Sequence, residues 1–340
     1  MLIGGNAPEV DLVVVLLTTG VIWVGSILLE SSAERLSAHY ALPAVVQGSV
    51  VVAVGSSFPE LASVVITALS GVFDMGVGAV VGSAIFNLLV IPGLSGLWAR
   101  GDLEANRTIV YKEAQFYMLA VSALVVTFAL AVIYIPVPGE TLVGEITRPL
   151  AVIPLLLYGL YLFVQWQDVG DHDVAGANNV PVAREWVRLV VGLAAILLGV
   201  ELLVGAVESL GAAYGVPEFL AGVTVVAAAT SLPDTIVSVR SARGGASVTS
   251  LGNVLGSNTF DLLVAIPVGV LIVGRVSINF AAAVPMFGTL TAATVILFIF
   301  LRTDLRLTRA ESWVLLIIYL LFVVWIVAET VGVTDLIIGI

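Results

Sequence analysis

The chain has 340 residues, of which 60% are hydrophobic and 11% are charged, and its mean hydropathy is +1.14. Soluble globular chains carry about 25% charged residues, so this composition excludes an ordinary soluble domain. The formal net charge is −11 and there is no cysteine, which excludes disulfides and thiolate metal sites. We expect no nucleic-acid partner.

Ten apolar stretches follow one another along the chain. A helix needs about 20 apolar residues to cross a hydrocarbon core of about 30 Å. The stretches are continuously apolar rather than alternating in polarity, so they predict helices and not the strands of a membrane barrel. The first has no basic residue before it, and we expect a retained helix rather than a cleaved signal peptide. The helices are expected at about 10–30, 41–70, 74–97, 114–135, 149–166, 186–210, 217–241, 248–273, 279–300 and 311–329.

Basic residues are distributed unevenly between the segments that join these helices. If the amino terminus is outside, eleven of the 13 basic residues fall on the inner side, and only Arg148 and Arg275 fall on the outer side. The positive-inside rule therefore favours ten helices in the cell (plasma) membrane with both termini extracellular. The eleven inward residues are Arg35, Arg100, Arg107, Lys112, Arg184, Arg188, Arg240, Arg243, Arg302, Arg306 and Arg309.

The chain also matches itself without gaps at an offset of 174 residues, which is the separation of Gly25 from Gly199. Proline, tyrosine, glutamate, serine and phenylalanine all recur at this offset, so the match is more than a shared bias for leucine and glycine. The matched pairs include Glu34 and Glu208, Tyr40 and Tyr214, Pro43 and Pro217, Gly48 and Gly222, Ser57 and Ser231, Pro59 and Pro233, Gly82 and Gly256, Ser83 and Ser257, and Phe86 and Phe260.

The repeat divides the chain into two halves of five helices each. We expect one repeat at 1–166 and the other at 186–340, joined by a polar cytoplasmic linker at 167–185 that is too short to hold a folded domain. Because five is an odd number, the second half must start from the opposite side of the membrane. The expected fold class is an all-α integral membrane protein with ten transmembrane helices in two inverted-topology repeats, an arrangement typical of secondary transporters.

Within the cores of the expected helices, away from their ends, acidic residues are rare, and the exceptions are Glu60, Asp234, Asp261 and Glu201. A carboxylate at bilayer depth costs about 2.5–3.5 kcal/mol on insertion scales, so each is a candidate functional residue. The alternative is a protonated residue used for helix packing, and for Glu201 that alternative stays open. The other three acids occupy matched positions of the repeat, which favours a function.

Two of these acids follow a proline inside a helix. The sequence reads Gly-Ser-Ser-Phe-Pro-Glu at 55–60 and Ala-Thr-Ser-Leu-Pro-Asp at 229–234. Proline removes a backbone donor and frees carbonyls around Ser56 and Thr230. Carbonyls, hydroxyls and a carboxylate form an all-oxygen environment, which suits Ca²⁺ and Na⁺ rather than zinc or copper. A proline used only for packing is the simpler alternative, and the acid in both copies favours binding.

The next helix of each half adds a second polar motif. The sequence reads Gly-Ser-Ala-Ile-Phe-Asn at 82–87 and Gly-Ser-Asn-Thr-Phe-Asp at 256–261. In each motif a serine and a polar residue four positions later share one face of the helix. These pairs are Ser83 with Asn87 and Ser257 with Asp261. Glycines four residues apart on the same helices allow close helix packing.

These motifs resemble the two alpha-repeats of the Ca²⁺/cation antiporter superfamily, in its sodium/calcium exchanger branch, which carry G-T/S-S-x-P-E followed by G-S-N-x-F-N/D. The resemblance covers the whole chain and implies an antiporter that exchanges Na⁺ for Ca²⁺ by alternating access, with no enzyme activity and no cofactor. It implies that Glu60 and Asp234 hold Ca²⁺. The further ligands that it implies are the backbone carbonyls of Ser56 and Thr230, and, for Na⁺, Ser57, Ser83, Asn87, Ser231, Ser257 and Asp261.

The sequence departs from the usual family motif at a few positions. Asp234 replaces the usual Glu, and Asp is one methylene shorter, so ion selectivity is less determined than the fold. The other departures are Ala84 for Asn, Ala229 for Gly and Ser56 for the commoner Thr. The resemblance also implies that the first and sixth helices slide across the core, helped by glycines at positions 20, 25, 199 and 205.

Other functions stay open at this point. With three acids the site carries a charge of up to −3, which one divalent ion with one proton, or three monovalent ions, would balance, and such carboxylates titrate as a coupled set. A proton-coupled cation antiporter is the second candidate, although that branch usually shows G-N-x-x-E without S-x-P-E. A cation channel would differ in lacking saturable turnover that needs a counter-ion. An intramembrane aspartyl protease built on Asp234 and Asp261 would need a G-x-G-D motif, which neither residue has.

Overall fold

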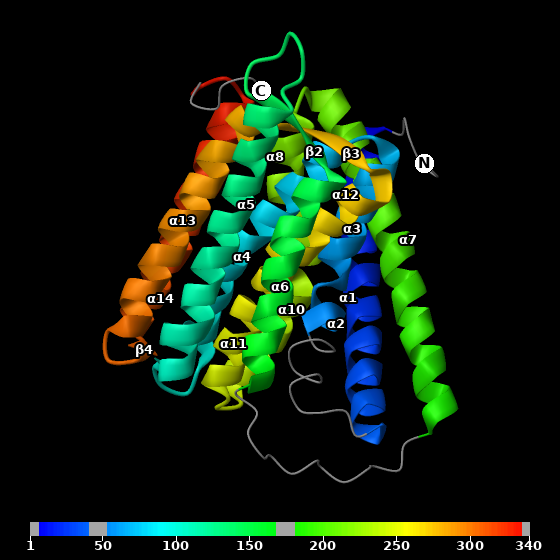
Figure 1. The fold of residues 1–340 in the computed structure, drawn as a ribbon. Helices are drawn as coiled ribbons and strands as arrows, with labels where there is room; N and C mark the ends of the chain where they lie inside the picture. The colour runs from blue at the N-terminus through cyan, green and yellow to red at the C-terminus, as the bar shows by residue number, and fades with distance from the viewer. Residues whose placement is uncertain (1–6, 41–52, 168–180, 335–340) are drawn as a thin grey trace.

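The computed structural model describes residues 7–40, 53–167 and 181–334, and these residues form a bundle of long helices (Figure 1). The helices of the first part are α1 (Pro8–His39), α2 (Ala53–Ser56), α3 (Phe58–Ser70), α4 (Phe73–Trp98), the π-helical η2 (Ile109–Glu113), α5 (Ala114–Tyr134) and α6 (Arg148–Gln167). Those of the second part are α7 (Val182–Tyr214), α8 (Glu218–Ala221), η3 (Gly222–Val226), α9 (Ala227–Thr230), α10 (Leu232–Arg243), α11 (Ser247–Phe260), η4 (Asp261–Ala265), α12 (Ile266–Val273), α13 (Phe280–Arg302) and α14 (Arg309–Thr330).

Within the described ranges, eight helices are long and apolar enough to cross a membrane, and a bent pair makes a ninth. The chain is therefore a helical membrane protein, as its composition predicts. The helix expected at 41–70 begins outside the described residues, and its described part is α2 and α3. Most of the expected linker, residues 168–180, and the repeat positions Pro43 and Gly48 also lie outside them.

Two helical segments are interrupted at a serine that precedes a proline by two residues. Ser57 separates α2 from α3, and Ser231 separates α9 from α10, where the helix bends by 46°. Pro59 and Pro233 each lie in the first turn of the new helix, a position that tolerates the missing N–H. The helix resumes in the same way after both breaks, because Leu61 N–H donates to the Ser57 carbonyl and Thr235 N–H donates to the Ser231 carbonyl, both at 3.1 Å.

Four short strands form two small antiparallel sheets that the sequence analysis did not predict. Strand β1 (Leu103–Glu104) pairs with β4 (Arg306–Leu307), and β2 (Val143–Thr147) pairs with β3 (Arg275–Asn279). The label of β4 lies at one end of the bundle and those of β2 and β3 at the other (Figure 1). Each sheet joins the first part of the chain to the second, so the two parts are connected at both ends.

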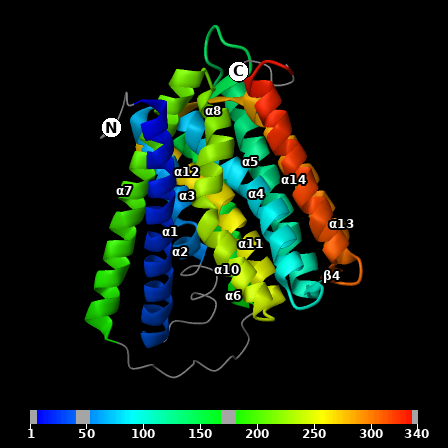
Figure 2. The same cartoon turned by 180° about the vertical axis from the view of Figure 1, so that it is seen from behind.

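Helices α1 and α7 lie side by side along one flank of the bundle (Figures 1 and 2). They run antiparallel, since a Cβ on Gly199 would contact Ile22, whereas a Cβ on Gly192 would contact the backbone of Gly25. At one end of this interface an ion pair joins the two helices, because Arg35 of α1 donates to the buried carboxylate of Glu185 of α7 at 3.2 Å. Glycines thus bring these two backbones close together, while Gly20 has no atom of another residue near its Cβ position.

Helix α4 forms the centre of the bundle. In its most apolar 18-residue window, 89% of residues are buried, against 17% for α14 at the periphery. Most of its residues are buried, and most of the buried ones are aliphatic residues, glycine or alanine. The polar side chains of this helix therefore lie far from the surrounding lipid, where they are costly unless they have a partner.

Candidate functional site

The structure buries all ten residues that the sequence analysis selected, and none is more than 2% exposed. They come from four places: the α2–α3 break, the α9–α10 break, the middle of α4, and the junction of α11 with η4. In that order they are Ser56, Ser57 and Glu60; Thr230, Ser231 and Asp234; Ser83 and Asn87; and Ser257 and Asp261. Their burial together fits a site, and their role as cation ligands stays a prediction.

Side chains of the two halves contact each other at this place. The Ser83 hydroxyl donates to Oε1 of Glu60 at 3.3 Å and lies 2.7 Å from the hydroxyl of Ser231. On the other side, the Ser57 hydroxyl donates to the backbone carbonyl of Ser257 at 3.4 Å. The two contacts are equivalent under the repeat. A shift of 174 residues relates Ser57 to Ser231 and Ser83 to Ser257, so each contact joins the same two positions of the repeat, one from each half.

The three acids lack the partners that buried carboxylates normally have. Neither carboxylate oxygen of Asp234 or of Asp261 accepts a hydrogen bond, and Oε2 of Glu60 accepts none either, within the part of the chain that the structure describes. None of the three forms an ion pair with a described basic residue. The three carboxyl groups lie close enough to repel one another when ionised, and in a medium of low dielectric constant that repulsion is costly unless a cation is bound. A bound cation would supply the missing partner.

Hydroxyl groups surround each acid in a similar way. Glu60 lies beside Ser83 of its own half and Thr230 of the other, and Asp234 lies beside Ser257 of its own half and Ser56 of the other. Each acid therefore lies near the helix break of the other half: Glu60 near the α9–α10 break and Asp234 near the α2–α3 break. Hard cations prefer such oxygen ligands.

No three His, Cys, Asp or Glu side chains converge tightly enough in the described ranges to chelate a metal ion by themselves. An ion at this place would share its coordination between carboxylates, hydroxyls, amide oxygens and carbonyls. Ligands of that kind suit ions that are bound and released rather than a permanently held metal.

Two residues that the sequence analysis did not select belong to this region. Asn258 is completely buried, accepts a hydrogen bond from Nδ2 of Asn87 at 3.0 Å and donates to the Ala84 carbonyl at 3.1 Å. Glu30 of α1 lies against the α2 backbone, with its Cα 3.6 Å from the place of a Cβ on Gly55, and its charge acts on Asp234. The G-S-N motif contains the signal for Asn258, whereas Glu30 follows no pattern of the repeat. Glu201 lies half-buried on α7.

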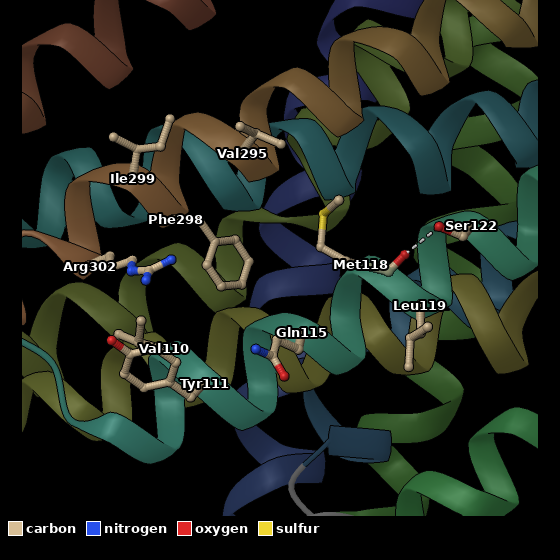
Figure 3. A pocket seen from close by; sticks show the side chains of 10 residues that line it. All are labelled: Val110, Tyr111, Gln115, Met118, Leu119, Ser122, Val295, Phe298, Ile299 and Arg302. Atoms are coloured by element: carbon tan, nitrogen blue, oxygen red, sulfur yellow. Dashed lines mark hydrogen bonds between the residues drawn. The ribbon is translucent and has the colours of Figure 1, made fainter.

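The ten residues are buried, and an open groove lies elsewhere on the bundle (Figure 3). This groove of about 520 Å³ runs between η2 with α5 and α13, and its lining includes Tyr111, Gln115, Met118, Phe298 and Arg302. The Arg302 guanidinium lies 5.9 Å from the centre of the Tyr111 ring. None of the ten predicted site residues lines it, so the groove belongs to the outer surface of the bundle.

Comparison with known proteins agrees with the family that the motifs resemble. The family model described as "Sodium/calcium exchanger protein" matches residues 10–167 and 184–328. The chain therefore belongs to the sodium/calcium exchanger family, which is a family of transporters and not of enzymes. The resemblance drawn from the sequence is confirmed at this level.

Relatives and solved structures extend over nearly the whole chain. The putative antiporter CaxA of Alkalimonas amylolytica is 28% identical over 90% of this chain and 97% of its own length. The sodium/calcium exchanger MaX1 of Methanosarcina acetivorans is 25% identical over 88% of this chain and 93% of its own. The structure of the sodium-calcium exchanger NCX_Mj, soaked with Na⁺, superimposes with a TM-score of 0.63 at 22% identity, covering 94% of this chain and 99% of that one. That structural likeness shows a common fold.

Proposed function

We propose that the chain is a secondary active antiporter that exchanges Na⁺ for Ca²⁺ across the cell membrane. The observation that carries this proposal is the group of three buried acids with unpartnered oxygens, placed where two broken helices meet. Glu60 and Asp234 are proposed to hold Ca²⁺ with the backbone carbonyls of Ser56 and Thr230. The remaining hydroxyl, amide and carboxylate groups of the ten-residue set are proposed to complete the Na⁺ sites. Because both ions need the same acids, neither can be bound fully while the other is present.

We further propose ten helices arranged as two inverted repeats, at 1–166 and 186–340. The antiparallel packing of α1 and α7 supports this, since Gly25 and Gly199 are equivalent positions. The two sheets support it as well, because each pairs the strand that follows the third span of one half with the strand before the fifth span of the other. A twofold axis in the membrane plane would exchange the two sheets, which lie at opposite ends of the bundle (Figure 1).

The orientation in the membrane follows from the charges of the two ends. The end that holds β4 carries Arg302, Arg306 and Arg309, and the end that holds β2 and β3 carries Arg148 and Arg275. We propose that the β4 end is cytoplasmic, together with the linker at 167–185, and that both termini are extracellular.

The direct test is ⁴⁵Ca²⁺ uptake into proteoliposomes that contain the purified protein. An outward Na⁺ gradient is expected to drive uptake, and Glu60→Gln and Asp234→Asn are each expected to abolish it. Uptake that follows a pH gradient and ignores Na⁺ would indicate proton coupling instead. Flux that needs no counter-ion and does not saturate would indicate a channel, and uptake unaffected by both substitutions would overturn the site.

Alternating access is proposed to occur by movement of α1 and α7 past the core. The chain has no cysteine, so engineered pairs can be cross-linked selectively. A disulfide between Glu30→Cys of α1 and Gly55→Cys of α2, whose Cβ atoms would lie 3.9 Å apart, is expected to stop exchange until it is reduced. The two single-cysteine variants, which cannot form this disulfide, are the controls and are expected to keep exchange under the same oxidising conditions. Full exchange with the first pair cross-linked would exclude this movement.

A further inference from the structure

Two buried side-chain amides meet between the halves of the chain, next to the acids. Asn87 lies on α4 and Asn258 lies on α11, and both are 0% exposed. Nδ2 of Asn87 donates to Oδ1 of Asn258 at 3.0 Å, and Nδ2 of Asn258 donates to the backbone carbonyl of Ala84 at 3.1 Å. These two bonds link α4 to α11 and return to α4.

This chain of hydrogen bonds has only one possible direction. The carbonyl of Ala84 can accept but cannot donate, so Asn258 must turn its NH₂ group toward it. Oδ1 of Asn258 then faces Asn87, which must present its own NH₂ group in turn. The Ser83 hydroxyl, 3.5 Å from the same nitrogen, agrees with that orientation.

The orientation leaves Oδ1 of Asn87 pointing away from these partners. This oxygen is buried and accepts no hydrogen bond among the described residues. A buried acceptor without a partner costs about 1–3 kcal/mol, and a cation would remove that cost. Ser83, which contacts Asn87, also donates to Glu60 and contacts Ser231, so the oxygen lies beside the acidic site.

We propose that Asn258 is a positioning residue, which holds the Asn87 amide so that its oxygen faces the transported cation. This inference rests on the proposed function for the identity of the ion and on the hydrogen bonds for the geometry. Asn258 itself would not contact the ion, since both ends of its amide are already occupied. It acts as do the residues around metal sites that orient a ligand without touching the metal.

The position of Asn258 relates this role to the repeat. Its partner Ala84 is the residue 174 positions earlier, so equivalent positions of the two halves touch. Of these two positions, only 258 carries a side-chain amide. The backbone carbonyl at position 84 accepts from that amide and so sets the direction of the hydrogen bonds. The replacement of the usual family Asn by Ala84 therefore leaves one fixed direction, rather than two amides that can exchange roles.

The test measures Na⁺-dependent ⁴⁵Ca²⁺ exchange in proteoliposomes for Asn258→Ala, Asn87→Ala and the double variant. Asn258→Ala is expected to raise the Na⁺ concentration for half-maximal exchange by about tenfold while the maximal rate changes little. If Asn258 acts through Asn87, the double variant is expected to be no worse than Asn87→Ala, because the two effects are not additive. Thr259→Ala is the matched control, since among the described residues the Thr259 hydroxyl donates to the Leu255 carbonyl of its own helix and to no other, and it is expected to change the half-maximal Na⁺ concentration less than twofold.

Two further measurements separate positioning from loss of packing. Asn258→Leu fills the space but restores no hydrogen bond, so it is expected to be as impaired as Asn258→Ala; recovery with Leu would overturn the proposal. Additive effects in the double variant would overturn it as well. The same variants are compared by thermal unfolding with and without Na⁺ or Ca²⁺. Asn258→Ala leaves the Ala84 carbonyl and the Asn87 amide unpaired, so ion-free stability is expected to fall, and the stabilisation that the ions add is expected to fall as well. A loss of ion-free stability with unchanged ion-induced stabilisation would indicate a packing role only. Absence of Na⁺-driven exchange by the unmodified chain would refute the proposed function, whereas non-additive loss of protection would still support the positioning role.

Discussion

The first and second halves of the chain bring equivalent helix breaks to the site but supply different acids. The first half contributes Glu60 and the neutral Asn87, whereas the second contributes Asp234 and Asp261. Glu60 accepts a hydrogen bond from Ser83, whereas neither oxygen of Asp234 accepts one among the described residues. The second half thus carries more negative charge with fewer partners. A backbone that follows a repeat can still form a site whose two sides bind ions unequally.

Moving the extra charge from one half to the other gives the largest expected effect. Asp261→Asn removes a buried acid that we propose to be a cation ligand, and loss of one member of a buried charge pair costs about 3–5 kcal/mol, which is about 100-fold to a few thousand-fold. We expect the apparent Na⁺ affinity to fall by about that factor in the proteoliposome assay.

The matched variant is Asn87→Asp combined with Asp261→Asn, which keeps the total charge and transfers it to the first half. It is expected to recover most of the lost affinity if the site depends on total charge. Equal impairment of the single and double variants would show that the asymmetry itself is required. Unchanged Na⁺ affinity in Asp261→Asn would remove this residue from the site.

Making the two proline-linked acids equal gives an effect of intermediate size. Asp234→Glu adds the methylene that the first half already has, so the carboxylate reaches further toward the ion. We expect the half-maximal Ca²⁺ concentration to fall by no more than about twofold to threefold, because packing strain near the lower end of about 1–3 kcal/mol offsets most of a tenfold gain, which is worth about 1.4 kcal/mol. Glu60→Asp is the mirror variant and is expected to weaken Ca²⁺ binding. Weaker Ca²⁺ binding in Asp234→Glu together with tighter binding in Glu60→Asp would indicate that the shorter acid is the better ligand.

The helices and the burial of the ten residues were predictable because they depend on local properties. Hydropathy places each span from its own residues, and the offset of 174 residues identifies the acids that lie together. The strands were not predictable, since Leu103 and its partner Leu307 lie 204 residues apart in the sequence and each strand is only two residues long. Asn258 was missed for a similar reason: its partner is a backbone carbonyl, Ala84, that the sequence does not show to be within reach.

Close contact between the halves is expected to affect stability before it affects ion affinity. A Cβ on Gly82 of α4 would overlap the carbonyl oxygen of Val223, and a Cβ on Gly222 would overlap that of Met75. Gly82→Ala and Gly222→Ala are each expected to destabilise the protein by about 1–3 kcal/mol, because backbone atoms cannot move aside as side chains can. Gly288→Ala on α13, where a Cβ meets no atom within 4 Å, is the control and is expected to be neutral in thermal unfolding. Equal behaviour of all three variants would mean that the halves are not packed this closely.

The smallest expected effect concerns the ion pairs beside the two sheets. Arg275 donates to Glu145 at 2.7 Å at one end of the bundle, and Arg306 donates to Asp102 at 3.2 Å at the other. Both arginine side chains are exposed by about half or more, 63% and 49%, and exposed pairs typically contribute about 0–1 kcal/mol. Arg275→Gln and Arg306→Gln should therefore leave thermal unfolding nearly unchanged, since the backbone ladders that connect the halves stay in place. If either end does respond, it should be that of Arg306, because β1 and β4 are joined at two residue pairs while β2 and β3 are joined at five. A larger loss with Arg275→Gln would contradict this and would mean that the side chains, rather than the ladders, hold the ends of the two halves together.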